Sequence, residues 1–490
     1  MATTYLGIDL GTTGIKAALF SERGELLGDG LAEYTLETPR PDIVELEPER
    51  YMEALATAIQ KALAASGKEA SSVRGIGITG QAETLVVADA KGNPLRKAIV
   101  WLDNRAVEEA HELETQFGMT RLFALSGQTE MLPCWPAAKI AWLRRHEPEV
   151  FRAAARYLMV EDFVAWRLTG VAATCRGLLP STITYDITTG EYADDVLDWL
   201  GVSKAQLPEL RHPGEPLGFT RGDVCGLPAG IPVAAAPLDH VCGCLGSGGG
   251  PGMATETTGC SLAICAPLPR LLYDEQRRIS TYHGYLPNSF VLLPWAPTAG
   301  MLLKHFRDEF CHGADYDSLG REAADVPPGA EGLILLPHCA GAVSPDCNPA
   351  ARGVAWGVTL AHKRGHWTRA IMESVAFLLR DNLEALSTLG AEFSELRSLG
   401  GAARSRLWLQ IKADVLKRPI TTTSCPEATS LGAAILGAVS AGDFPNPGEA
   451  ASAMVRTALR IEPGPDAERY ESLFQQYRKL NQLLLPTFSN

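Results

Sequence analysis

The first residues that could do chemistry lie between positions 7 and 16, in the sequence GIDLGTTGIK. Its glycines allow a tight turn that points amide N–H groups towards a phosphate, and the Thr12 and Thr13 hydroxyls add donors. Asp9, at a strand end, could hold Mg²⁺ through water, because this ion keeps several of its own waters. Lys16 could reach a phosphate oxygen. An ordinary hairpin turn is the alternative, and the spacing is not that of a P-loop.

A second candidate segment is RSLGGAARS at residues 397–405. An apolar strand enters a Gly400–Gly401 turn, and a helix is expected to begin near Ser405, which can act as its N-cap. A turn of this kind admits the close approach of a flat base or a ribose, and the start of a helix favours polar ligand atoms. A plain strand-to-helix connection is the alternative.

Asp239 and His240 follow the apolar run 231–236. An aspartate at the C-terminal end of a strand is a candidate general base. The Asp–His pair also suggests a hydrolase dyad or a metal site. However, neighbouring residues on a strand point to opposite faces and do not easily form one dyad. The alternative for His240 is a structural histidine.

Two polar loops, at residues 80–84 and 101–105, each follow an apolar run. Both could project polar groups into one pocket, with Gln81, Glu83 and Asp103 as the candidates. Carboxylates accept several hydrogen bonds and so suit vicinal hydroxyls. Solvated loops with surface ion pairs are the alternative.

These candidates are positioned by strands that alternate with helices. Residues 5–9 and 15–20 predict a β-hairpin, and residues 48–65 have helical spacing with a stop at Gly67. Residues 73–79 and 98–102 predict buried strands that end at the two polar loops. The alternation predicts an α/β fold.

A chain of 490 residues exceeds the size of one hydrophobic core and predicts two domains. The glycine-rich segment 246–252 suggests a boundary. Residues 255–264 then repeat the pattern of strand, small-residue turn and strand seen in residues 5–20. We therefore expect two related hairpins, one in each of the domains 1–247 and 248–490.

Composition excludes several classes of protein. A formal net charge of −13 argues against a nucleic-acid partner. The N-terminus lacks the basic region of a signal peptide, and the longest apolar run, 431–441, is too short to span a membrane. The eleven cysteines are scattered, which favours a reducing, cytoplasmic compartment. Cys242 and Cys244 suggest either a metal site or two buried thiols.

The order and spacing of these segments resemble the FGGY family of carbohydrate kinases, which includes glycerol kinases and xylulokinases. The resemblance extends from Tyr5 to about Gly437. Residues 131–146 and 353–374 resemble the two family signatures, with departures at Cys134, Ala355 and Trp367. The most specific match is the long array from Gly400 to Ala434, which is similar to the adenosine-side motif of the family.

The resemblance implies two ribonuclease-H-like domains of the actin and hexokinase type flanking a central cleft. It implies ATP and Mg²⁺, a small sugar or polyol as acceptor, Asp239 as general base, and a possible homodimer. With the candidates above, the expected substrate-binding residues are Gln81, Glu83, Asp103, Asp239 and His240. The expected phosphate- and nucleotide-binding residues are Thr12, Thr13, Gly14, Lys16, Gly259, Cys260, Gly300, Gly401 and Ser405, with Asp9 at the metal.

Departures from the family pattern leave the substrate open. Glu83 matches an acidic residue of glycerol kinases where xylulokinases have His, and Ala82 matches neither group. Cys260 and Ala402 replace a usual threonine and a usual glycine on the ATP side. The main expectation is a ketose kinase acting on a sugar such as xylulose. The alternatives are a glycerol- or tetritol-type polyol kinase, a nucleotide-binding protein with weak or no catalysis, or an actin-like ATPase.

Overall fold

The computed structural model describes residues 3–222 and 224–488. The chain forms two compact units that are not consecutive along the sequence. The first comprises Met1–Gly248, Leu268–Val291 and Glu427–Arg456. The second comprises Gly249–Pro267, Leu292–Pro426 and Thr457–Asn490. The division into family-type domains at residue 247 stays a prediction.

A mixed six-stranded sheet forms the centre of the first unit, with the order β14-β15-β6-β1-β2-β3. β1 and β2 form the predicted antiparallel hairpin, and β1, β6 and β15 run parallel. β14 returns antiparallel to β15. The strands are β1 (Thr4–Leu10), β2 (Gly14–Ser21), β3 (Leu26–Glu33), β6 (Val73–Gly80), β14 (Pro216–Phe219) and β15 (Pro232–Ala235).

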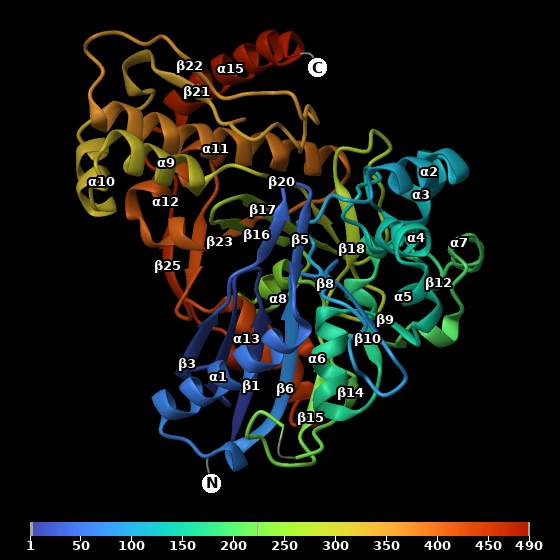
Figure 1. Ribbon diagram of the computed structural model, residues 1–490. Helices are drawn as coiled ribbons and strands as arrows, with labels where there is room; N and C mark the ends of the chain where they lie inside the picture. The colour runs from blue at the N-terminus through green and yellow to red at the C-terminus, as the bar shows by residue number, and fades with distance from the viewer. Residues whose placement is uncertain (1–2, 223, 489–490) are drawn as a thin grey trace. The chain divides into compact units, whose positions relative to one another are not determined.

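Helices cover both faces of this sheet (Figure 1). α13 packs closely on β1 and β6, because a Cβ on Gly7 or Gly77 would lie 1.8 Å from a carbonyl oxygen of α13. α8 packs beside α13 on the same face, while α1 and α6 lie on the other face. The helices of this unit are α1 (Pro48–Ser66), α2 (Val107–Phe117), α3 (Met119–Ser126), α4 (Pro136–His146), α5 (Pro148–Ala153), α6 (Val160–Thr169), α7 (Asp194–Leu200), α8 (Asp239–Gly246), α13 (Ala428–Ser440) and α14 (Pro447–Met454).

Smaller sheets complete the first unit. A five-stranded sheet has the order β4-β5-β8-β7-β9, and two pairs, β10 with β13 and β11 with β12, lie outside it. These strands are β4 (Glu37–Arg40), β5 (Ile43–Leu46), β7 (Leu85–Ala88), β8 (Ala98–Ile99), β9 (Arg156–Met159), β10 (Ala173–Cys175), β11 (Tyr185–Asp186), β12 (Glu191–Tyr192) and β13 (Glu209–Arg211). β18 (Ser280–His283), in the later segment of this unit, belongs to none of these smaller sheets.

The second unit repeats the topology of the first. Its strands run β17-β16-β23-β24-β25, with directions that match β2-β1-β6-β15-β14. The strands are β16 (Met253–Thr258), β17 (Leu262–Leu268), β19 (Phe290–Leu293, which begins in the first unit's segment), β20 (Trp295–Ala296), β21 (Ile334–Leu336), β22 (Val354–Trp356), β23 (Glu395–Leu399), β24 (Ile420–Thr423) and β25 (Thr457–Ile461). The helices are α9 (Gly300–Phe310), α10 (Tyr316–Ala324), α11 (Arg364–Thr388), α12 (Arg406–Leu416) and α15 (Ala467–Leu484).

The predicted elements agree with the structure at both hairpins, at α1 and at β6. α1 ends at Gly67, whose φ of 63° is the left-handed conformation that suits a helix C-cap. The strand expected at residues 98–102 contains only Ala98–Ile99, because the Asp103 N–H donates to the Val100 carbonyl and turns the chain. Among the described residues, no helix has both the length and the apolar composition needed to cross a bilayer. The predicted two-domain α/β fold class is confirmed.

Candidate active site

The hairpin of the first unit places Asp9 on β1 opposite Lys16 on β2. Burial, and then the negative charge of Asp239, raise the pKa of the Asp9 carboxyl to about 7. Lys16 Nζ lies 2.6 Å from Oε2 of Glu427, the residue that precedes α13. Lys16 was expected at a phosphate, and it has a carboxylate partner in this structure.

Two aromatic side chains hold the turn of this hairpin. The Trp101 indole N–H donates to Thr12 Oγ1 at 2.9 Å, and the Tyr34 hydroxyl donates to the Gly11 carbonyl. The Thr13 carbonyl accepts from the Tyr34 N–H, while its side chain is exposed. These hydrogen bonds fix the turn at Gly11, Thr12 and Thr13, whereas the Thr13 side chain stays accessible.

Asp239 is the first residue of α8, three residues after β15 ends. Its side chain is 35% exposed and that of His240 is 33% exposed. Asp239 Oδ1 accepts from the His240 backbone N–H at 2.5 Å, whereas His240 Nε2 lies 4.0 Å away. The prediction that both residues lie at a strand end, facing opposite sides, is wrong because a helix begins at Asp239.

The loop after β6 holds two residues in the left-handed conformation, Ala82 with φ 50° and Glu83 with φ 48°. Such non-glycine residues cost on the order of 1–3 kcal/mol each and persist only where neighbours fix them. Here Glu161 Oε1 accepts from the Ala82 N–H at 2.9 Å. The buried Lys139 ammonium donates to the Glu83 carbonyl at 2.9 Å and to the Val100 carbonyl at 3.0 Å. The side chains of Glu161 and Lys139 therefore fix the backbone that carries Glu83.

The Glu83 side chain is buried and accepts a hydrogen bond from the Ser181 hydroxyl. Burial raises the pKa of the Glu83 carboxyl to about 7; Ser181 and Lys139 oppose this shift, and the Asp239 charge contributes a smaller part of it. Gln81, two residues before Glu83 in the chain, is only 8% exposed. Its amide nitrogen and oxygen make no hydrogen bond of good geometry to the described residues, and the Tyr34 and Tyr51 hydroxyls are its polar neighbours. A buried amide without such a bond is costly and suits a polar ligand.

Asp103 has a different environment. It is fully buried, and its oxygens accept from the Val44 N–H at 2.6 Å and from Arg105 Nε at 2.8 Å. We therefore assign Asp103 to the support of its loop. Glu83 and Gln81 remain the predicted substrate-binding residues of the loop after β6.

Sequence reasoning assigned no role to four residues that hold the candidate site, namely Lys139, Glu161, Ser181 and Glu427. Lys139 carried a usable signal, because it is a lysine within the largely apolar, buried helix α4. A buried lysine needs several acceptors. Burial lowers the pKa of the Lys139 ammonium to about 8. The other three residues are far from their partners in the sequence and contact them only in the folded chain.

Three segments predicted to contact a nucleotide meet within the second unit. The Cys260 carbonyl, in the β16–β17 turn, accepts from the Ala299 and Met301 N–H groups at 2.9 and 3.1 Å. A Cβ on Gly300, the first residue of α9, would lie 2.3 Å from the Gly259 carbonyl oxygen. A Cβ on Gly400 would lie 2.8 Å from the Thr258 carbonyl oxygen. The turn at Gly259–Cys260, the start of α9 and the Gly400–Gly401 turn are therefore adjacent.

Side chains around these segments agree with the sequence analysis where it made a prediction. Ser405 caps α12, with its hydroxyl accepting from the Trp408 N–H at 3.3 Å. Cys260 is exposed, and no atom lies within 4 Å of a Cβ built on Gly401. Cys242 and Cys244 are both buried in α8.

A buried ion pair underlies the second hairpin. Lys412 Nζ lies 2.6 Å from Glu256 Oε1 and 2.9 Å from the Thr258 hydroxyl, and both charged side chains are fully buried. The Thr258 and Ser398 hydroxyls also donate to the Glu256 carboxylate. The network joins β16, β23 and α12 directly below the Gly259–Cys260 turn.

Comparison with known proteins identifies the protein family to which this chain belongs. Residues 4–246 match the N-terminal domain, and residues 257–441 the C-terminal domain, of the FGGY family of carbohydrate kinases. The chain is thus a phosphotransferase that uses ATP. It belongs to the FGGY family of carbohydrate kinases.

Individual relatives come from two groups within this family. The chain is 30% identical to the xylulose kinase of Escherichia coli K12, over 98% of this chain and 99% of the relative. It is 31% identical to the glycerol kinase of Citrifermentans bemidjiense, over 98% of each chain. The solved xyloylose kinase of Brucella ovis superposes with a TM-score of 0.90 at 29% identity, covering 98% of this chain and 99% of that one.

Proposed function

We propose that this kinase transfers the γ-phosphoryl group of ATP to a hydroxyl of a small ketose such as xylulose, with Asp239 as general base. The observation that carries the proposal is an electrostatic one. The charge of Asp239 raises the pKa of both Asp9 and Glu83, so the three carboxyl groups share one region of the first unit. The Asp239 side chain is 35% exposed and is more accessible than that of Glu83, which is buried.

Each of these groups has a separate task in the proposal. Glu83 and the buried Gln81 amide bind vicinal hydroxyls of the acceptor. Asp239 accepts the proton of the attacking hydroxyl as the oxygen bonds to the γ-phosphorus and the bond to the β-phosphate oxygen breaks. Phosphoryl transfer depends on positioning and charge stabilisation. The fixed backbone of residues 81–83 supplies the positioning.

The residues of the first unit fit a magnesium ion. Asp9 and Asp239 are oxygen donors, and after burial the Asp239 charge is the next largest cause of the raised pKa of Asp9. A divalent cation relieves repulsion between carboxylates, and Mg²⁺ commonly uses one or two carboxylates together with waters and phosphate oxygens. Asp9 would hold the ion through water, and the ion would neutralise charge on the phosphates. Thr12, Thr13, Gly14 and Lys16 are the proposed phosphate contacts of this unit.

The second unit supplies the nucleotide side in this proposal. Gly259, Cys260 and Gly300 present main chain to the phosphates, and Gly401 with the capped helix at Ser405 receives the adenosine. Their adjacency within the unit supports this assignment.

A polyol kinase is the second candidate, because Glu83 offers glycerol or a tetritol the same carboxylate. A coupled ADP-release assay across ketoses and linear polyols tests both. The proposal predicts the highest kcat/KM with a ketose. A preference for glycerol or a tetritol would select the second candidate, and the lack of any sugar- or polyol-dependent ADP would contradict both.

A further inference from the structure

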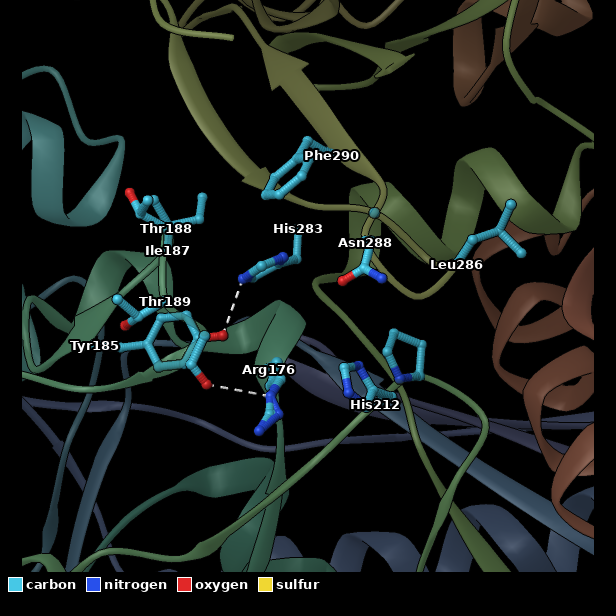
Figure 2. A pocket seen from close by; sticks show the side chains of 13 residues that line it. Arg176, Tyr185, Ile187, Thr188, Thr189, His212, His283, Leu286, Asn288 and Phe290 are labelled. Carbon is cyan, nitrogen blue, oxygen red and sulfur yellow. Dashed lines mark hydrogen bonds between the residues drawn. The ribbon is translucent and has the colours of Figure 1, made fainter. Parts of the chain in front are cut away.

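A separate cavity of about 250 Å³ lies within the first unit (Figure 2). None of the predicted site residues lines it. The lining side chains come from the segments 176–190, 212–213 and 283–290. Figure 2 shows Arg176, Tyr185, His212, His283 and Asn288 arranged around one space.

The lining of this cavity contains basic residues and no acidic ones. It contains one arginine and two histidines, and none of its lining residues is acidic. Arg176 is 17% exposed, and its hydrogen bonds to the Gly190 carbonyl and to Glu191 are both long, at 3.3 Å. Glu191 is itself 63% exposed, so solvent screens that ion pair. The guanidinium is therefore only weakly neutralised.

His283 is held in place beside this arginine. Its Nε2 lies 2.9 Å from the Tyr185 hydroxyl, and the Phe290 ring packs 5.1 Å from the imidazole. Burial, and then the positive charges of Arg176 and His212, lower the pKa of His283 to about 4. His283 is therefore a neutral hydrogen-bonding group near pH 7, and Arg176 supplies the positive charge of the cavity wall.

The cavity lies on the opposite side of β18 from the candidate active site. Tyr282 is hydrogen-bonded to Gln128 at 3.0 Å, and its pKa is raised by burial and by the Glu83 charge. His283, the next residue, faces the cavity. Because neighbouring strand residues point to opposite faces, β18 separates the two environments.

We propose that this cavity binds a phosphate group, either as inorganic phosphate or as the phosphate monoester of a small sugar. A guanidinium fork matches the geometry of phosphate oxygens, and Asn288 and Thr188 offer further donors. The volume lies below the roughly 300–1,000 Å³ of pockets for larger ligands, which suits a compact anion. The site is independent of the acceptor proposed above.

Isothermal titration of the full chain tests the proposal, with inorganic phosphate in one arm and a pentulose phosphate in the other. A saturating non-hydrolysable ATP analogue keeps phosphate from the nucleotide site. Arg176→Gln is expected to weaken binding by about tenfold or more, the effect of losing a charge-assisted bidentate contact. Arg321→Gln, an exposed arginine on α10, is the matched control and is expected to change nothing.

The two arms distinguish the source of the phosphate group. Arg176-dependent binding of both ligands means that the phosphate alone suffices, and binding of only the sugar phosphate means that the ester is required. Absence of Arg176-dependent binding in both arms overturns the proposal.

A spectroscopic readout covers the case in which Arg176→Gln does not fold. In the wild-type chain, phosphate is expected to shift the NMR signals of the His283 and His212 ring protons, assigned with His283→Gln and His212→Gln. His305, exposed on α9, serves as the unaffected control. Equal shifts at all three histidines, or no shift, would contradict a site in this cavity.

Discussion

The two hairpins of this kinase share one topology but differ in where their charges lie. In the first unit, Asp9 and Lys16 are partly accessible at the mouth of the β1–β2 turn, and the Lys16–Glu427 pair is 29% and 21% exposed. In the second unit, Glu256 and Lys412 are fully buried beneath the β16–β17 turn. The charged side chains of the first hairpin are therefore accessible to a ligand. The second hairpin instead presents its main chain above a buried, hydrogen-bonded ion pair.

In the proposed reaction, this difference gives the two units separate tasks. A reacting hydroxyl needs a nearby carboxylate, and the first unit gathers Asp9, Glu83 and Asp239. A nucleotide needs close backbone approach, and the second unit provides the turns at Gly259 and Gly400 on a base fixed by hydrogen bonds.

The largest expected effect on stability comes from the buried pair. Lys412→Met leaves the Glu256 charge without its cation, which costs about 3–5 kcal/mol for a buried pair. Lys16→Met removes a partly exposed pair and is expected to cost about 1 kcal/mol or less. Calorimetric unfolding of the two variants measures the contrast. Equal losses would show that the two hairpins are not held differently.

Glu83→Gln tests the acceptor side of the first unit. Loss of a charged hydrogen-bond acceptor typically costs about 1.5–3 kcal/mol, so kcat/KM for the sugar is expected to fall roughly 10- to 100-fold. The KM for ATP is expected to stay unchanged. Glu22→Gln, at an exposed position, is the control. A parallel loss in ATP affinity would place Glu83 outside the acceptor site.

Glu161→Gln tests the support of the loop at residues 81–83 through pH. Burial raises the pKa of Glu161 from 4.5 to about 8. The folded chain therefore keeps a proton that the unfolded chain releases. This group lowers stability as pH rises from about 4.5 to 8, by up to about 1.4 kcal/mol per pH unit.

The glutamine variant keeps an acceptor for the Ala82 N–H and cannot titrate. Its free energy of unfolding is expected to depend less on pH across this window, as urea titrations at pH 5.5 and 8 can show. An unchanged slope would mean that Glu161 is ionised in the folded protein.

The smallest effect is expected at Cys260. Its carbonyl makes the structural contacts, and its side chain is exposed, so the second hairpin should tolerate a new side chain. Cys260→Ser is expected to change the KM for ATP by less than about threefold, the size of a weak neutral hydrogen bond. A gain beyond tenfold would mean that the hydroxyl itself contacts the phosphates and that the main-chain account is incomplete.

Local patterns predicted much of this structure. Short apolar runs around glycine turns predicted both hairpins, helical spacing with Gly67 predicted α1, and Ser405 predicted the cap of α12. These features depend on residues close in sequence. Family resemblance supplied the class of reaction.

Long-range partners could not be predicted in the same way. Lys16 pairs with a residue 411 positions away, and nothing near either residue indicates the other. Asp103 and Glu83 both follow apolar runs, yet Asp103 is fully engaged by Arg105 and Val44. The left-handed backbone at Ala82 and Glu83 also depends on distant neighbours, because Lys139 and Glu161 hold it.

The central claim is that Asp239 removes the acceptor proton. The most direct measurement compares ATP binding with sugar-dependent ADP release in Asp239→Asn, using Asp29→Asn on the exposed edge of β3 as the matched control. Loss of a general base is expected to lower kcat by roughly 10²- to 10⁴-fold, with the Kd for ATP within about threefold of the wild type. Near-normal turnover in Asp239→Asn would contradict the account.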